Sequence, residues 1–347
     1  MRFFSNITAL ALAFASLASA NPAPLRRQAS KSAGGYVFAY FTGNDNGRES
    51  IFLAASNGNN ALSWTELNGG KPILTSTKGT KGLRDPFLMR SHEGDRFFLV
   101  ATDLKVEDIG WPDSQRVGSL HLEIWESTDL INWSEQRHTL VSNPTAGMTW
   151  APEAYYDEEI GKYVVYWASR LFAEDDPNHK VGTYARILYA TTSDFIKFSE
   201  PVIWQDSNDR IDSTVLKVGN TYHRFTKDMG KTPSDCVDII QESSPRLRDG
   251  QDGWSLVTSC IGKNAGLGAV EGPSIFKSNP GDVNGDKFYL FVDEFGGRGY
   301  IPLETKDIAN PKWVVSEKYS LPKSPRHGSV VSVTEEELAA VVKAYSK

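Results

Sequence analysis

Five short motifs recur along the chain at a nearly constant spacing, and this repeat limits the possible fold more than any other feature. Each motif places an acidic residue or a histidine where an apolar run begins. Successive motifs follow at intervals of 68, 59, 59 and 56 residues, counted between Asp85, Glu153, Asp212, Glu271 and His327. A fixed period of this length is typical of repeat architectures, in which each repeat is one supersecondary unit.

A second marker repeats with the same period. An aromatic residue lies in a turn near the end of each unit, at intervals of 69, 65, 56 and 59 residues: Trp64, Trp133, Phe198, Trp254 and Trp313. Between the markers, each unit contains short β-rich runs separated by polar turns. Four short strands per unit, repeated five times, predict an all-β fold, a five-bladed β-propeller. A β-sandwich is the alternative, but it gives no reason for two markers to keep one period.

The two ends of the chain complete each other. The first unit lacks an opening strand with a carboxylate, and the last such strand, 327–333, has no strands after it. We therefore expect ring closure by the C-terminal strand, which would pair beside the run 36–41. The chain then ends in a helix that Thr334 and Glu337 would cap.

The N-terminal segment has the composition of a targeting sequence. Arg2 precedes an apolar run at 7–17, and Ala18-Ser19-Ala20 offers a cleavage site. These features predict a signal peptide over residues 1–20 and secretion to the extracellular space. The apolar run is too short to span a bilayer. We expect a pro-segment or linker at 21–34 and the catalytic propeller domain at 35–347.

Charge limits the classes of partner. The formal net charge is −6, and it becomes −9 without residues 1–27, because that segment holds three arginines and no acids. No run rich in Lys or Arg stands out. Nucleic acid and membrane are therefore not expected as partners, whereas uncharged polymers remain candidates. We expect a monomer.

Two cysteines are expected to form a disulfide. Cys236 and Cys260 would lie opposite each other in a hairpin centred near Arg248, and secretion permits the bond. Two unpaired buried thiols are the alternative.

The propeller fold predicts which residues meet. The first strand of each blade lines the central channel, so its opening residues face one another at one end. The second strand runs back antiparallel, so its last residues reach the same end. The first group comprises Asp85, Glu153, Asp212, Glu271 and His327; the second comprises Phe41, Asp103, Arg170, Lys227 and Asp293.

Several acids around one pocket suit the acid–base cleavage of a glycosidic bond. One carboxylic acid protonates the leaving oxygen while one carboxylate activates water. A third acid can hold the pKa of the first high, because neighbouring negative charge disfavours ionisation. Taken singly, each motif would be read as a turn.

The series RDP, WAPE, IDST, EGPS and RHG resembles glycoside hydrolase family 43, the inverting five-bladed arabinanases, arabinofuranosidases and xylosidases, over residues 36–333. This resemblance implies that Asp85 is the general base, Asp212 the pKa modulator and Glu271 the general acid. Trp150 and Glu153 match the second-blade motif, although the family more often has Asp at the position of Glu153.

The same resemblance bears on cofactors. His327 matches a channel histidine that lies near a bound calcium or sodium ion in some members, which makes it a possible metal ligand. No cofactor is expected to be required.

Finer similarity points to a substrate. The run Tyr40–Asn44, the turn Asn68–Pro72 and the split closing blade look most like secreted fungal exo-1,5-α-L-arabinofuranosidases. This implies α-1,5-arabinan and arabino-oligosaccharides of the plant cell wall as substrates. The full set of expected substrate-binding residues is Phe41, Arg84, Asp103, Trp150, Glu153, Trp167, Arg170, Lys227, Phe295, Arg298 and His327. The aromatic members of the set could stack on sugar or equally belong to the core.

Other functions stay open at this point. A β-xylosidase or an arabinoxylan arabinofuranohydrolase would have the same fold. A retaining fructan hydrolase would need an Asn-Asp-Pro nucleophile in the first blade, where the chain offers only Asn44-Asp45-Asn46. A sugar-binding propeller without catalysis would not need three acids at one channel end.

Overall fold

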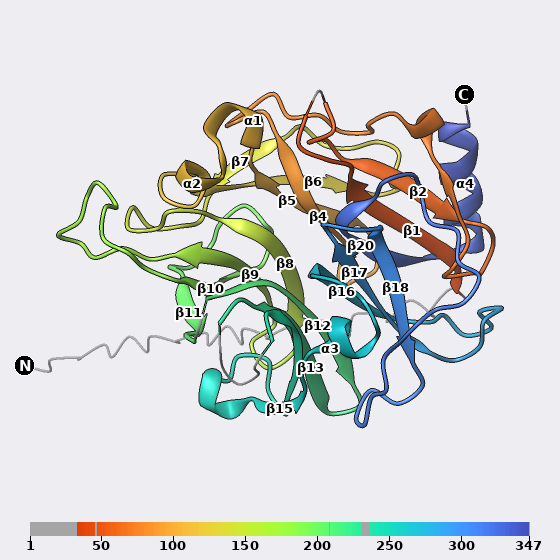
Figure 1. Cartoon of the computed structure of the whole chain (residues 1–347). Helices are drawn as coiled ribbons and strands as arrows, with labels where there is room; N and C mark the ends of the chain where they lie inside the picture. Colours follow the sequence, from red (N-terminus) through yellow and green to blue (C-terminus); the bar gives the residue numbers. More distant parts are fainter. Residues whose placement is uncertain (1–32, 46, 208, 231–235, 347) are drawn as a thin grey trace, which may run out of the picture. The chain divides into compact units, whose positions relative to one another are not determined.

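Twenty strands form five four-stranded antiparallel sheets within the residues that the structure, a computed structural model, describes: 33–45, 47–207, 209–230 and 236–346. The five sheets are arranged as the blades of a ring (Figure 1). The predicted five-bladed β-propeller is therefore confirmed. The predicted signal peptide, 1–20, lies outside the described residues, as does the predicted linker up to residue 32.

The blades are listed from the innermost strand outward. Blade 1 contains β20 (Arg326–Thr334), β1 (Ala33–Phe41), β2 (Phe52–Ser56) and β3 (Trp64–Glu66). Blade 2 contains β4 (Leu83–Arg90), β5 (Phe97–Asp103), β6 (His121–Ser127) and β7 (Arg137–Leu140). Blade 3 contains β8 (Trp150–Asp157), β9 (Lys162–Arg170), β10 (Ala185–Thr192) and β11 (Val202–Gln205). Blade 4 contains β12 (Arg210–Val218), β13 (Thr221–Asp228), β14 (Asp238–Ser244) and β15 (Ser255–Thr258). Blade 5 contains β16 (Glu271–Lys277), β17 (Phe288–Glu294), β18 (Gly299–Thr305) and β19 (Val314–Val315).

The described helices are short except for the last one. They are η1 (Asn68–Gly70), α1 (Val106–Ile109), α2 (Trp111–Ser114), η2 (Gln251–Gly253), α3 (Ile261–Asn264) and α4 (Glu335–Tyr345). Among the described residues, no helix has both the length and the apolar character needed to cross a bilayer.

The C-terminal strand closes the ring as expected. β20 pairs antiparallel with β1, with Tyr36 opposite Ser332 and Phe38 opposite Val330. The pairing extends to Ala33 opposite Thr334, so the sheet begins two residues before the predicted boundary at residue 35.

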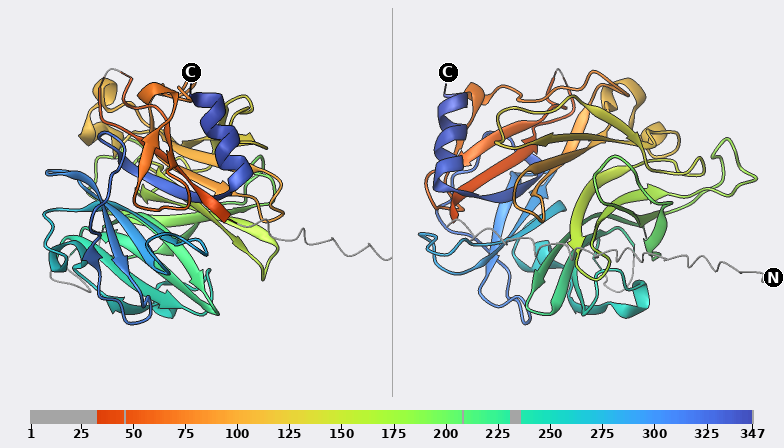
Figure 2. Two further views of the ribbon diagram at one scale, coloured as in Figure 1. Left: turned by 90° about the vertical axis from the view of Figure 1, so that its right-hand side faces the viewer. Right: turned by 180° about the vertical axis from the view of Figure 1, so that it is seen from behind.

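Helix α4 packs on blade 1 and contacts blade 2 (Figure 2). Thr334 and Glu337 form the expected capping box. Glu337 also pairs with Arg90 of β4 at 2.6 Å, while Leu338 and Val341 are buried against the core of blade 1. The last segment of the chain thereby holds blades 1 and 2 together.

Each pair of neighbouring blades encloses one hydrophobic cluster, because both faces of every blade are covered. Blades 1 and 2, for example, share Val37, Leu53, Leu99 and Val331. The repeated turn aromatics find their explanation here, since each packs into the cluster that its blade shares with the preceding blade. The five are Trp64, Trp133, Phe198, Trp254 and Trp313.

Cys236 and Cys260 form the predicted disulfide, with their Cα atoms 5.7 Å apart. The bond ties the segment before β14 to the second residue after β15, so it closes the outer hairpin of blade 4. Replacing both cysteines by serine should lower the free energy of unfolding by about 3 kcal/mol, because a loop of this length is released in the unfolded chain. Denaturant-induced unfolding of the double variant and of the oxidised parent measures the difference. Equal unfolding midpoints would show that the bond adds nothing to stability.

Candidate active site

The inner strands begin with the same irregularity in every blade. The pairing register shifts between Arg84 and Phe87 in blade 2, and equivalent shifts occur in the other four blades. In four blades a residue with positive φ occupies the shift: Asp85 (49°), Ala151 (48°), Asp212 (52°) and Gly272 (55°). Bulges of this kind redirect side chains and are common next to active sites.

These bulges correct one expectation, because the five motif residues do not share one structural position. Asp85 and Asp212 occupy the bulge itself, Glu271 precedes it by one residue, and Glu153 follows the bulge residue Ala151 by two. In blade 5 the bulge residue is Gly272, whose Cβ would lie 2.7 Å from the His327 ring. The glycine therefore leaves the space that the imidazole fills.

His327 lies between the acids of different blades. Its Nδ1 is 3.4 Å from Oδ1 of Asp85 and 4.0 Å from Oδ2 of Asp212. Burial alone would lower the pKa of His327, but the hydrogen bond with Asp85 and the charges of Asp212, Asp85 and Glu153 raise it to about 9. The side chain is therefore an imidazolium at neutral pH.

This charge bears on the possible role of His327 as a metal ligand. A protonated imidazole has no lone pair to offer a metal. His327 therefore acts as a cation among these carboxylates, and its possible role as a ligand of calcium or sodium stays a prediction.

Asp85 is held as a carboxylate. Thr102 donates a hydrogen bond of 2.9 Å to its Oδ2, and the same hydroxyl accepts one of 2.8 Å from the backbone N–H of Ala151. Burial would raise the pKa of Asp85, but His327, Arg84 and Thr102 outweigh that effect and lower it.

Glu271 has the opposite environment. Burial and the negative charges of Asp212 and Asp293 raise its pKa to about 7, although Arg326 and Lys227 oppose the shift. Nη2 of Arg326 is 3.5 Å from Oε1 of Glu271, and the same guanidinium pairs with Asp293. Glu271 is thus a carboxyl group that still carries its proton over part of the neutral range.

Asp212 lies beside Glu271, as the resemblance implies. Its Oδ2 accepts a hydrogen bond of 3.0 Å from the backbone N–H of Gly272, the residue after Glu271. Burial and Asp85 raise its pKa, while His327 lowers it; the balance is a raised pKa.

Two further predicted residues support this end of the channel. Glu153 is buried, accepts a hydrogen bond of 3.1 Å from the Tyr166 hydroxyl, and has its pKa raised to about 8 chiefly by burial. Lys227 donates to the carbonyl of Val270 at 2.7 Å, directly before Glu271. Lys227 therefore holds the start of β16 and adds positive charge there.

An arginine and three aromatic rings stand beside the acids. The guanidinium of Arg84 lies 4.4 Å from the ring centre of Phe41 and 5.1 Å from that of Trp111. Glu49 pairs with Arg84 at 3.1 Å. Trp111, on α2, is 42% exposed and contacts Trp150 edge-on at 6.0 Å. Sugar rings commonly stack on exposed aromatic surface of this kind, and Trp111 offers it.

Sequence reasoning missed Trp111, Thr102 and Arg326. Arg326 belongs to the RHG motif and directly precedes His327, the residue of that motif that was predicted to lie in the site. Thr102 adjoins the predicted Asp103 at the end of β5. Trp111 belongs to the loop between β5 and β6, outside the repeat, so no periodic signal marks it.

Two predicted substrate-binding residues are wrong. Trp167 is fully buried in the cluster between blades 2 and 3 and has no surface for a sugar. Asp103 points away from the channel and accepts hydrogen bonds from the backbone and hydroxyl of Thr80. Side chains alternate along a strand, so Thr102 takes the inward position and Asp103 faces the other side.

The remaining predicted residues lie at the same end of the ring without contacting the acids. Arg170 ends β9, is 3.7 Å from Asp209, and lines a cavity of about 360 Å³ with Phe172 and His179. Phe295 is 47% exposed in the turn after β17, and Arg298 of that turn pairs with Glu294 at 2.7 Å.

A larger cavity, of about 400 Å³, lies further along the inner strands toward the opposite end of the channel. Its lining is mostly apolar and includes Phe87, Met89, Leu216 and Ile275. Glu158 is its one acidic lining residue, so this cavity lacks the acid–base chemistry of the first end.

Comparison with known proteins places the chain in a family. A family model related to glycoside hydrolase family 43, described as "Probable glycosyl hydrolase domain", matches residues 32–339. An α-L-arabinofuranosidase of Bifidobacterium longum subsp. longum is 37% identical over 299 residues. That alignment covers 77% of this chain and 28% of the relative, so the chain spans little more than a quarter of that protein's length.

Solved structures share the fold. The α-L-arabinanase of Penicillium chrysogenum complexed with arabinobiose is 13% identical with a TM-score of 0.52, covering 85% of this chain and 79% of that one. The α-L-arabinanase of Cellvibrio cellulosa complexed with arabinohexaose is 12% identical with a TM-score of 0.53, covering 84% and 94%. At such identities the likeness concerns the fold alone. Since the family model spans all five blades, the chain belongs to the glycoside hydrolase family 43-related glycosyl hydrolases.

Proposed function

We propose that the protein is an inverting glycoside hydrolase that cleaves α-L-arabinofuranosyl linkages, with Asp85 as general base and Glu271 as general acid. The observation that carries the proposal is that two carboxyl groups at one channel end have pKa values shifted in opposite directions. The pKa of Asp85 is lowered and that of Glu271 is raised to about 7. Acid and base roles in an active site are assigned by environments that push pKa values apart in this way.

Asp85 suits the activation of water. It is ionised, and its hydrogen bond from Thr102 and its contact with His327 fix its orientation. A carboxylate has about four acceptor positions, so it can still accept the proton of an attacking water molecule. Thr102 and His327 act as positioning residues for this base.

Glu271 suits protonation of the leaving oxygen. Burial and the charge of Asp212 keep it protonated, because a buried site and a second negative charge both disfavour ionisation. After the proton has left, the Arg326 guanidinium at 3.5 Å stabilises the carboxylate that remains. Every step of this mechanism uses carboxyl groups and water.

The choice of sugar rests on the relative. The 37% identical protein of Bifidobacterium longum is named an α-L-arabinofuranosidase. We further propose exo action on α-1,5-arabinan and arabino-oligosaccharides of the plant cell wall, by a monomer, on the resemblance of the runs 40–44 and 68–72. Secretion is proposed from the N-terminal segment, and the disulfide suits an oxidising compartment.

The proposal is tested by following the anomeric proton signals of the product while α-1,5-arabinotriose is hydrolysed. Inversion should release the β-anomer of arabinofuranose first, because water attacks from the face opposite to the leaving group. Xylobiose, treated in parallel, should stay intact. First appearance of the α-anomer would remove Asp85 from its role as the base that activates water. Cleavage of xylobiose alone would favour the β-xylosidase alternative.

Substitutions of the two acids should differ in their dependence on the leaving group. Asp85→Ala should abolish turnover of every substrate. Glu271→Ala should reduce turnover of arabinotriose by about 10²–10⁴-fold, the usual contribution of a general acid. It should retain far more activity on a nitrophenyl arabinofuranoside, whose leaving group needs little protonation. Glu158→Gln, beside the opposite cavity, is the matched control. Equal losses on both substrates would contradict the acid role of Glu271.

The pH dependence of kcat/KM should respond to the charges beside Glu271. Activity should fall as the pH rises through about 7, because the acid loses its proton. Asp212→Asn removes a negative neighbour, so it should lower the pKa of Glu271 and move this limb to lower pH. Arg326→Gln removes a positive neighbour and should move the limb to higher pH. Shifts of both variants in one direction would show that the limb does not report Glu271.

A further inference from the structure

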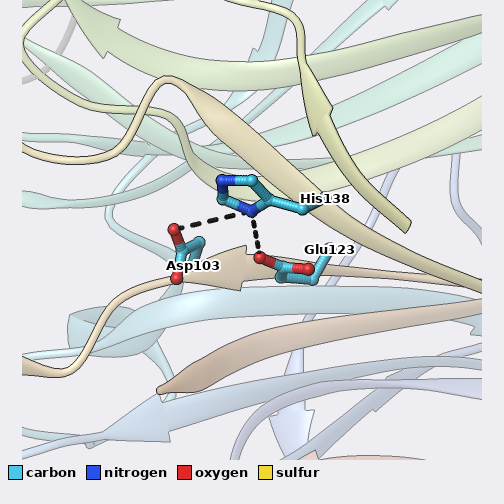
Figure 3. Close-up of side chains that lie close together, drawn as sticks. All are labelled: Asp103, Glu123 and His138. Carbon is cyan, nitrogen blue, oxygen red and sulfur yellow. Dashed lines mark hydrogen bonds and ion pairs between the residues drawn. The ribbon is translucent and has the colours of Figure 1, made fainter. Parts of the chain in front are cut away.

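A second cluster of ionisable side chains lies in blade 2, apart from the channel acids. Asp103, Glu123 and His138 come from the neighbouring strands β5, β6 and β7 and point toward one another (Figure 3). Their ligand atoms all lie within 4.8 Å of one another, and no other group of three or more His, Cys, Asp or Glu residues in the described part of the chain does so.

The strand pairing builds this cluster. Glu123 and His138 are direct partners in the pairing of β6 with β7. Nδ1 of His138 lies 2.5 Å from Oε1 of Glu123 and 4.0 Å from Oδ2 of Asp103. The side chains of Glu123 and Asp103 are 0% and 1% exposed, and that of His138 is 25% exposed.

Two buried carboxyl groups thus face a single imidazole. Within the described ranges, no lysine or arginine side chain contacts Asp103 or Glu123. Buried charges are normally paired or coordinate a metal, because desolvation of an unpaired ion is costly. One imidazole can supply at most one positive charge for these two carboxyl groups.

The carboxyl group of Asp103 turns one oxygen away from this centre and one toward it. Its Oδ1 accepts two hydrogen bonds from Thr80, of 2.8 and 2.7 Å. Its Oδ2 faces Nδ1 of His138 at 4.0 Å, which is beyond hydrogen-bond distance. Gly79 lies against the same carboxyl group, and a Cβ at this position would come within 2.2 Å of Oδ2.

The surroundings orient the three side chains as they would around a cation. Thr80 holds one oxygen of Asp103, and Gln136 donates to Oε2 of Glu123 at 2.5 Å. Each carboxyl group therefore turns its other oxygen toward the centre. His121 stacks on the His138 ring at 3.9 Å, nearly parallel, and fixes its plane. Such outer hydrogen bonds are typical of metal sites.

We propose that Asp103, Glu123 and His138 bind a divalent transition-metal ion, with Zn²⁺ as the best match. Two carboxylate oxygens and one imidazole nitrogen suit Zn²⁺, which binds such ligands at about 2.0–2.2 Å and can complete a tetrahedron with water. The ion would replace the direct hydrogen bond between His138 and Glu123, so these atoms would separate by roughly 0.5–1 Å. Its two positive charges would compensate both carboxylates.

The site would brace the chain next to the channel without entering the chemistry. Gly79 and Thr80 lie in the segment that leads into β4, which carries Arg84 and Asp85. Asp103 ends β5 directly after Thr102, the hydrogen-bond donor to Asp85. A bound ion would fasten the incoming segment to the end of β5. The inference goes beyond the proposed function, and metal binding is measurable without any sugar.

The test is a calorimetric titration of the chelator-stripped, untagged full chain with ZnCl₂, together with thermal unfolding at saturating metal. The parent protein should bind one ion with a Kd in the micromolar range or below and gain a few degrees in Tm. Glu123→Gln and His138→Gln should each weaken binding by at least about 10-fold and lose the gain in Tm. His92→Gln, an exposed histidine stacked on Tyr156, should behave as the parent.

Two further variants test the zinc site without changing its three ligands. Thr80→Val leaves all three ligands in place but removes the hydroxyl that donates a hydrogen bond to Asp103, so it should weaken Zn²⁺ binding by about 10-fold. This variant tests the site even if a ligand variant does not fold. His327→Gln should not change Zn²⁺ affinity. The proposal would be overturned by equal Zn²⁺ affinity in the parent and the Glu123→Gln variant, or by loss of binding in the His327→Gln variant. It would also be overturned if anomalous diffraction from crystals of the zinc-bound protein located the ion at another place.

Discussion

The antiparallel pairing of β20 with β1 is the contact on which the rest of the structure depends. Each blade buries both faces against its neighbours, so an open ring would expose two apolar faces, one on blade 1 and one on blade 5. The same pairing carries Arg326 and His327, from the end of the chain, to the acids of blades 2, 4 and 5. Closure therefore stabilises the fold and completes the site in one step.

Charge compensation around His327 explains how several buried acids coexist. One imidazolium faces Asp85 and Asp212 and lies near Glu153. It lowers the pKa of Asp85 but cannot offset the burial of Glu153, whose pKa rises to about 8. Burial, Asp212 and Asp293 raise the pKa of Glu271, and Arg326 limits this rise. Burial, the His327 imidazolium and the neighbouring carboxyl groups together lower the pKa of Asp85 and raise that of Glu271, and an inverting pair needs one ionised and one protonated carboxyl group.

The period of the repeat was sufficient to predict the fold, because the two kinds of marker residue have the same structural role in every blade. The turn aromatics fill the clusters between blades, and the motif residues open the inner strands. Ring closure followed from the same pattern, whereas the disulfide was predicted from the hairpin that brings Cys236 opposite Cys260; both are confirmed.

The site was only partly predictable, because register and loops are not periodic. A bulge displaces Glu271 and Glu153 from the position of Asp85, and no sequence signal gives its location. Alternation at the end of β5 sends Thr102 inward in place of Asp103. Trp111 reaches this end of the channel from a short helix in the loop between β5 and β6, and the described residues of the other blades contain no helix in this loop.

The end of β5 shows how one strand can serve two sites with different tasks. Thr102 and Asp103 are adjacent, yet strand alternation directs their side chains to opposite faces of blade 2. One side chain contacts Asp85, and the other belongs to the cluster with Glu123 and His138. No side chain needs to bridge the two, because they share a backbone that four strands hold in place. Anything that tightens the cluster must therefore act on Asp85 through the position of the main chain, not through its charge environment, whose largest contributions come from burial and His327.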